Sequence, residues 1–160
     1  MQAADLAASL PRPDVIVCSP LRRAQQTADA WGSPFEVDER WIEVDYGRFD
    51  EQPIDQLSAA DEARWHLEPD FSPGGMETLA SLSTRVTEAC EELRARAQTS
   101  VVVVVTHVGP IKAALGWALG VGPSVGQRMF VEDAGVSRID LDGGRPIVRW
   151  FNRFGDQPGQ

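Results

Sequence analysis

Five consecutive valines, residues 101–105, run directly into Thr106 and His107, and Gly109 and Pro110 follow. An unbroken β-branched run predicts a strand buried on both faces, as in a parallel sheet covered by helices. The next segment, IKAALGWAL, predicts a helix with Pro110 at its first position. His107 is therefore expected between a central strand and a helix. In open α/β sheets that edge is where ligands bind.

Strand and helix patterns alternate along the rest of the chain, which predicts an α/β fold with a mainly parallel sheet in a three-layer α/β/α sandwich. We expect one domain spanning residues 1–160. Strands are expected at 14–19, 35–41 and 101–105, helices at 2–10, 21–31, 54–66, 76–97 and 110–119, and two late strands at 130–142 and 146–152 that can form a hairpin around Asp142, Gly143 and Gly144.

Composition excludes several classes of partner. The formal net charge of −9 argues against a broad nucleic-acid footprint and against binding to anionic membranes. No apolar run approaches membrane-spanning length, and the N-terminus does not resemble a signal peptide. Cys18 and Cys90 are too few for a disulfide framework, and we expect both to be buried thiols in a cytoplasmic protein.

Two arginines, Arg22 and Arg23, follow the first predicted strand in the segment SPLRRA. Ser19 and Pro20 resemble the N-cap and first position of a helix. A helix N-terminus favours anions, and a guanidinium adds paired donors that suit phosphate. The segment therefore indicates a phosphate site; a solvated pair of surface arginines is the open alternative.

His107 and the acidic loop of residues 43–50 are the other candidates. At the C-terminal end of an apolar strand, an imidazole can bind phosphate as a cation or transfer protons, although a lone histidine is often structural. The loop EVDYGRFD contains Glu43, Asp45, a glycine and two aromatic residues. Taken alone, it fits a solvated loop as well as a functional one.

Four segments together resemble the histidine phosphatase superfamily, in its phosphoglycerate mutase-like branch. SPLRRAQQTA (19–28) resembles the first signature, WIEVDYGRFD (41–50) the acidic loop, PGGMETLASLSTRV (73–86) the segment that opens a long helix, and VTHVGPIKAAL (105–115) the second-histidine motif. Their order is that of the family and they span nearly the whole chain. The last motif and the tail are most similar to α-ribazole phosphatase-like and acid phosphatase-like members.

The resemblance implies a role for each matching residue. Arg23 is expected to bind phosphate, His107 to contact the phosphoryl group, and Glu43 to donate a proton to the leaving oxygen. Arg22 occupies a variable position and is a possible further phosphate ligand. Glu77 falls near a conserved acid of the family, although Met76 is inserted beside the expected spacing.

The family's nucleophile, the histidine of an Arg-His-Gly motif on the first strand, has no counterpart here. The two histidines are His66, in the polar stretch RWHLEPD, and His107. The resemblance implies that the chain is truncated before the first helix and lacks a strand in the middle of the sheet. That loss would leave a gap, or would force residues 15–18 and 101–105 to pair directly. We expect the chain as given to be inactive, because covalent catalysis has no nucleophile.

The function implied is hydrolysis of a small-molecule phosphate monoester through a phosphohistidine, without a metal or other cofactor. A non-catalytic domain that binds a phosphate ligand or serves as a scaffold is the alternative. A mutase is less favoured, since the chain between the acidic loop and SPGG offers few basic groups for a second phosphate. Neither the physiological substrate nor the oligomeric state follows from the sequence.

Overall fold

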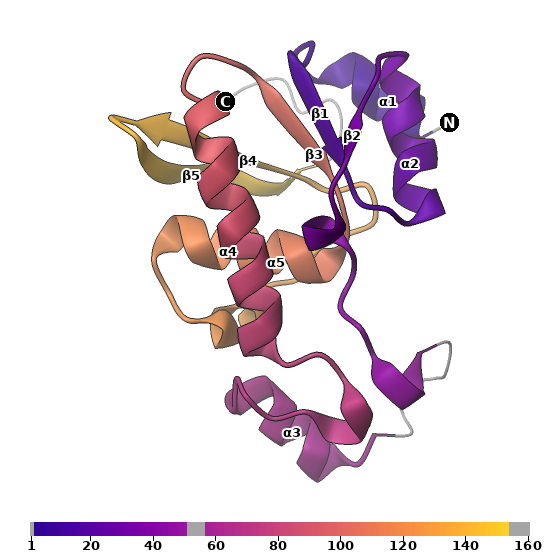
Figure 1. Cartoon of the computed structure of the whole chain (residues 1–160), viewed down its shortest axis with the longest axis vertical. Helices are drawn as coiled ribbons and strands as arrows, with labels where there is room; N and C mark the ends of the chain where they lie inside the picture. The colour runs from indigo at the N-terminus through magenta and orange to yellow at the C-terminus, as the bar shows by residue number, and fades with distance from the viewer. Residues whose placement is uncertain (1, 51–56, 154–160) are drawn as a thin grey trace.

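The computed structural model describes residues 2–50 and 57–153. Three parallel strands form one sheet in the order β2 (Glu36–Val37), β1 (Val15–Cys18), β3 (Val102–Val105). A second sheet is the antiparallel hairpin of β4 (Val136–Asp142) and β5 (Arg145–Arg153), which turns at Gly143 and Gly144 as expected. The α/β class and the parallel sheet are confirmed (Figure 1).

Helices cover the parallel sheet on both faces. On one face, Ala24 and Ala28 of α2 (Arg22–Ala28) pack with Ile16, Cys18 and Val105. On the other face the larger cluster joins Val17 to the buried side of α4, and Ala113, Ala114 and Trp117 of α5 pack against it. The remaining bounds are α1 (Gln2–Ser9), α3 (Ala59–Leu67), α4 (Leu79–Arg96) and α5 (Val108–Leu119), with short 3₁₀ turns η1 (Asp29–Trp31), η2 (Glu39–Trp41), η3 (Gly47–Phe49), η5 (Pro73–Gly75) and η6 (Pro123–Arg128).

The prediction that the valine strand is central to its sheet is wrong. β3 is an edge strand that pairs only with β1 among the described residues, with Val15 opposite Val102 and Cys18 opposite Val105. Residues 102–104 are consequently half-buried, and only Val105 is buried. Of the two expected consequences of a lost strand, direct pairing of β1 with β3 is the one observed. The far edge of β3 borders a large cavity instead.

Capping side chains account for most differences in element boundaries. The Thr78 side chain accepts a hydrogen bond from the Ser81 N–H, so α4 begins at Leu79 rather than at Met76. The Asp38 carboxylate accepts from the Arg40 N–H and starts η2, so β2 stops after two residues. The helix expected at 54–66 runs from Ala59, behind its N-cap Ser58; residues 54–56 lie outside the described part.

The two strand-to-helix junctions also differ in detail from the prediction. α2 begins at Arg22 behind Leu21, and Ser19 does not cap it; the Ser19 hydroxyl accepts the Leu21 N–H in a local turn instead. α5 begins at Val108, so Pro110 occupies its third position and His107 is its N-cap residue. No described helix combines the length and apolar character that crossing a membrane requires.

Candidate active site

His107 and Ser19 meet at the carboxyl ends of β3 and β1. These strands are neighbours in register, so the residues that follow them emerge side by side. Ser19 is fully buried and His107 is 8% exposed, and the distance from His107 Nε2 to Ser19 Oγ is 2.7 Å. Ser19 was not predicted as a site residue. Its position directly after a strand parallel to the valine run was the signal that could have identified it.

Arg23 completes this cluster from the first turn of α2. Its Nε donates to His107 Nδ1 at 3.3 Å. A guanidinium can only donate, so Nδ1 is the acceptor and the imidazole proton resides on Nε2, from which it is donated to Ser19. Arg22 is exposed, like Arg23, but only Arg23 reaches the histidine. The structure therefore brings Arg23 and His107 together and leaves Arg22 outside this contact.

His107 is held as a neutral imidazole. Burial lowers its pKa to about 4, and the nearby charges of Arg23 and Arg85 lower it further in the same direction. Since the folded-state pKa lies below the ordinary value of 6.5, the unfolded chain takes up this proton first as the pH falls. Stability from this group is complete above pH 6.5 and is lost as the pH falls through the folded-state pKa. The same positive surroundings favour an anion beside the ring.

Glu43 reaches the same edge of the sheet from the acidic loop. Its Oε1 accepts the N–H of Val44 at 2.9 Å and the N–H of Gly109, in the first turn of α5, at 3.0 Å. Asp45, by contrast, is exposed and accepts the N–H of Gly47 within its own turn. Glu43, Arg23 and His107 all border one large cavity. The acidic loop thus places Glu43, rather than Asp45, at the candidate site.

Gly109 is required by the close approach of Glu43. A Cβ at position 109 would lie 2.5 Å from Glu43 Oε1. Gly109→Ala should displace the carboxylate, destabilise the fold by about 1 kcal/mol through lost hydrogen bonds, and speed hydrogen exchange at the Val44 amide. The matched control is Gly116→Ala on the same helix, where the nearest atom lies at an ordinary 3.5 Å. That variant should gain about 0.5–1 kcal/mol in chemical denaturation. Equal effects of the two substitutions would contradict this account of Gly109.

An ion pair behind the site holds the Glu43 loop. Arg85 on α4 donates to the Glu77 carboxylate at 2.7 and 2.8 Å. The same guanidinium donates to the carbonyls of Arg40, Ile42 and Glu43 at 2.6, 2.8 and 3.3 Å. Glu77 therefore orients Arg85, and Arg85 fixes the backbone that carries Glu43. The sequence gave no signal for Arg85, because a lone arginine on a helix is ordinary.

His66 lies on α3, against the ring of Trp65, and no contact joins it to His107 in the part of the chain that the structure describes. Within residues 2–50 and 57–153, no group of three or more histidine, cysteine or acidic side chains is arranged to hold a metal ion. Both cysteines are buried thiols, and burial raises the pKa of Cys18 to about 11.

Comparison with known proteins agrees with this geometry. The model of the histidine phosphatase superfamily (branch 1) matches residues 1–153. Phosphoserine phosphatase 1 of Hydrogenobacter thermophilus is 33% identical over 163 residues, which cover 94% of this chain and 76% of that protein.

Two solved structures share the fold at 22% identity. Phosphoserine phosphatase from Entamoeba histolytica, in complex with 3-phosphoglyceric acid, has a TM-score of 0.83–0.85 in two crystal forms of that protein, the higher match covering 95% of this chain and 80% of that one. α-Ribazole phosphatase from Shigella flexneri has a TM-score of 0.79 and covers 98% and 84%. The resemblance seen in the four sequence motifs is confirmed.

Proposed function

Because this chain belongs to the histidine phosphatase superfamily (branch 1), we propose that its site binds the phosphoryl group of a phosphate monoester. The contact of Arg23 Nε with His107 Nδ1 across 84 residues of sequence is the observation that carries this proposal. It leaves the two terminal amino groups of Arg23 for an anion. The N-terminus of α5, which starts directly after His107, adds the positive end of a helix dipole.

His107 and Glu43 would divide the remaining tasks. His107, with Arg23, would stabilise the charge that develops on the phosphoryl oxygens. Glu43 would protonate the leaving oxygen. Since Oε1 already accepts two N–H groups, the transferred proton would reside on Oε2. The route we propose is covalent, through a phosphohistidine, and needs no metal.

The nucleophile of that route is neither of the two histidines of this chain. His107 Nδ1 accepts from Arg23 and its Nε2 contacts Ser19, so both nitrogens are engaged. His66 lies on α3 without a contact to the cluster among the described residues. We therefore propose that residues 1–160 alone bind phosphate esters but do not hydrolyse them. A non-catalytic phosphate-binding domain is the second candidate function, and the engagement of both His107 nitrogens favours it.

Small phosphorylated metabolites are the substrate class that the relatives support. Phosphoserine phosphatase 1 of Hydrogenobacter thermophilus is the 33% identical relative, and the similar folds include phosphoserine and α-ribazole phosphatases. We propose a small-molecule phosphate monoester of this kind. The single domain, the cytoplasmic location and the lack of nucleic-acid partners stay predictions.

Anion binding tests the proposal. Phosphate or vanadate at about ten times its Kd should stabilise the fold by about 1.4 kcal/mol and raise the melting temperature by several degrees. Arg23→Ala should remove this shift. Arg22→Ala is the matched control, since Arg22 is exposed and does not contact His107, and it should keep most of the shift. A wild type without stabilisation at millimolar anion, or an Arg23→Ala variant that behaves like it, would sink the proposal.

A further inference from the structure

A cavity of about 1410 Å³ separates β3 from the β4–β5 hairpin. It exceeds the roughly 300–1,000 Å³ of most small-molecule sites. Two of its walls are strand edges, because residues 101–105 and 136–142 all line it. Figure 1 shows the hairpin on the side of β3 that faces away from β1. The part of the cavity between β3 and β4 is called the strand slot below.

The backbone of β3 points polar groups into the strand slot. The carbonyls of Val101 and Val105 accept hydrogen bonds from Val15 and Ser19, on the β1 side. Backbone groups of a strand alternate between its two sides, so those of Val102 and Val104 are directed away from β1 and toward the slot. An open strand edge is a template for pairing with another strand, and leaving it unpaired inside a fold is costly.

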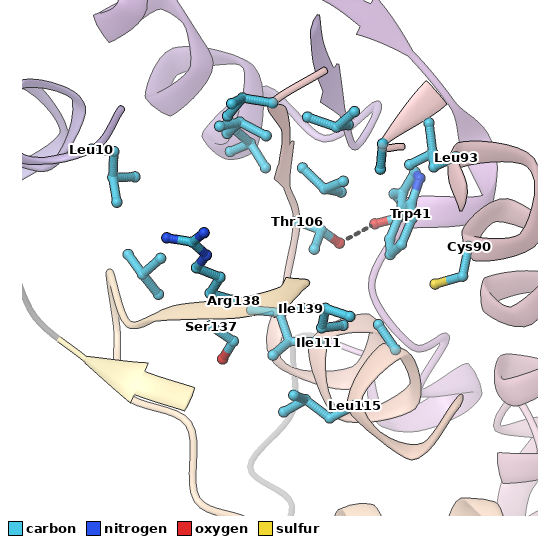
Figure 2. Close-up of a pocket in the computed structure, with 18 of the residues that line it drawn as sticks. Leu10, Trp41, Cys90, Leu93, Thr106, Ile111, Leu115, Ser137, Arg138 and Ile139 are labelled. Atoms are coloured by element: carbon cyan, nitrogen blue, oxygen red, sulfur yellow. Dashed lines mark hydrogen bonds between the residues drawn. The ribbon is translucent and has the colours of Figure 1, made fainter. Parts of the chain in front are cut away.

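The other surfaces of the strand slot are apolar side chains from helices on both faces. Leu6, Leu10 and Trp31 contribute from the side of α1 and η1, and Leu93, Ile111 and Leu115 from α4 and α5. Figure 2 shows Leu10, Ile111, Leu115 and Ile139 around the space beside Thr106. Strand edges on two sides and apolar helices above and below are the surroundings of a strand buried in a three-layer fold.

We propose that the strand slot binds one extended apolar peptide segment, about four to six residues long, whose backbone pairs with both β3 and β4. The segment belongs to a polypeptide stretch that these 160 residues do not contain. The stretches outside the described part, EQPIDQ (51–56) and FGDQPGQ (154–160), are polar and contain proline, so they are poor strand formers. The fold of the Entamoeba histolytica phosphatase supports an external segment, because the match leaves 20% of that chain without a counterpart here.

This inference goes beyond the proposed function, since strand binding requires no chemistry at Arg23 or His107. The probe is a capped synthetic peptide, Lys-Thr-Val-Ile-Val-Val-Thr-Lys, added to the full 160-residue chain. The control is the same peptide with alternate central amides N-methylated, which keeps the side chains and removes the ladder donors. The readouts are the melting temperature and residue-resolved amide hydrogen exchange.

The unmodified peptide should raise the melting temperature by about 4 °C or more, and should slow exchange at Val102 and Val104 by about tenfold or more. Val103 and Val105, whose backbone faces β1, should change little. The N-methylated peptide should do neither. Three results would overturn the proposal. They are no response to millimolar peptide, an equal response to both peptides, and a dimer of the chain alone in which Val102 and Val104 are already protected, which would make a second copy the occupant.

Discussion

Purified residues 1–160 are expected to show no turnover of p-nitrophenyl phosphate above the uncatalysed rate. Removing the nucleophile from a covalent enzyme costs on the order of 10⁶-fold in kcat, with only a small residual rate from binding groups. His107 cannot substitute without breaking its contacts to Arg23 and Ser19. Phosphate binding, in contrast, should persist, because Arg23 and His107 are in place. Release of p-nitrophenolate, followed at protein concentrations high enough to detect slow turnover, is the measurement.

His66→Ala serves as the control for that experiment. If the wild type were active and His66→Ala were not, His66 would be the nucleophile and its place on α3 would have been misjudged. Turnover that survives His66→Ala and is lost in His107→Ala would make His107 the nucleophile. Either outcome would contradict the division of roles proposed for the site.

Arg85→Met should destabilise the fold by about 3 kcal/mol, as expected when one partner of a buried ion pair is removed. The side chains of Arg85 and Glu77 are only 18% and 13% exposed, so the substitution leaves a buried carboxylate and three backbone carbonyls without their donor. The loop that carries Glu43 should loosen as a result. Chemical denaturation measures the first effect, and faster amide exchange at Val44 and Gly109 measures the second.

Arg96→Met is the matched control, on the same helix. Arg96 pairs with Glu36 at 2.7 Å, but both side chains face solvent, and exposed pairs contribute little. That variant should leave the stability nearly unchanged and should not alter exchange at Val44. If Arg85→Met were as mild as Arg96→Met, the Glu77–Arg85 pair would not hold the Glu43 loop.

The elements of the fold follow from local patterns in the sequence. The valine run, the apolar spacing of α4 and the paired glycines of the hairpin each predicted the correct element. Boundaries were less predictable, since they depend on which side chain caps a turn, as Thr78 and Asp38 show. The valine run also could not reveal that β3 is an edge strand, because neighbour pairing is a tertiary property and the apolar run is the same in either case.

The candidate site was predictable where it depends on strand ends and not where it depends on distant packing. Arg23 and His107 each follow a strand of one parallel sheet, and the register of Cys18 with Val105 brings them together. Glu43 was proposed from family resemblance alone. Arg85 was missed because its contacts lie 42 to 45 residues away along the chain, on backbone carbonyls that carry no sequence signal.

The protonation of His107, followed by NMR of the imidazole carbons, tests most directly whether Arg23 and His107 form one anion site. Without added anion, the pKa of His107 should lie near about 4. Bound phosphate should raise it by about one unit or more, because a neighbouring anion stabilises the imidazolium. In Arg23→Ala this phosphate-dependent rise should disappear, and the His66 signals should not respond to phosphate in either protein. A His107 pKa that is indifferent to phosphate in the wild type, or equally responsive without Arg23, would contradict the account.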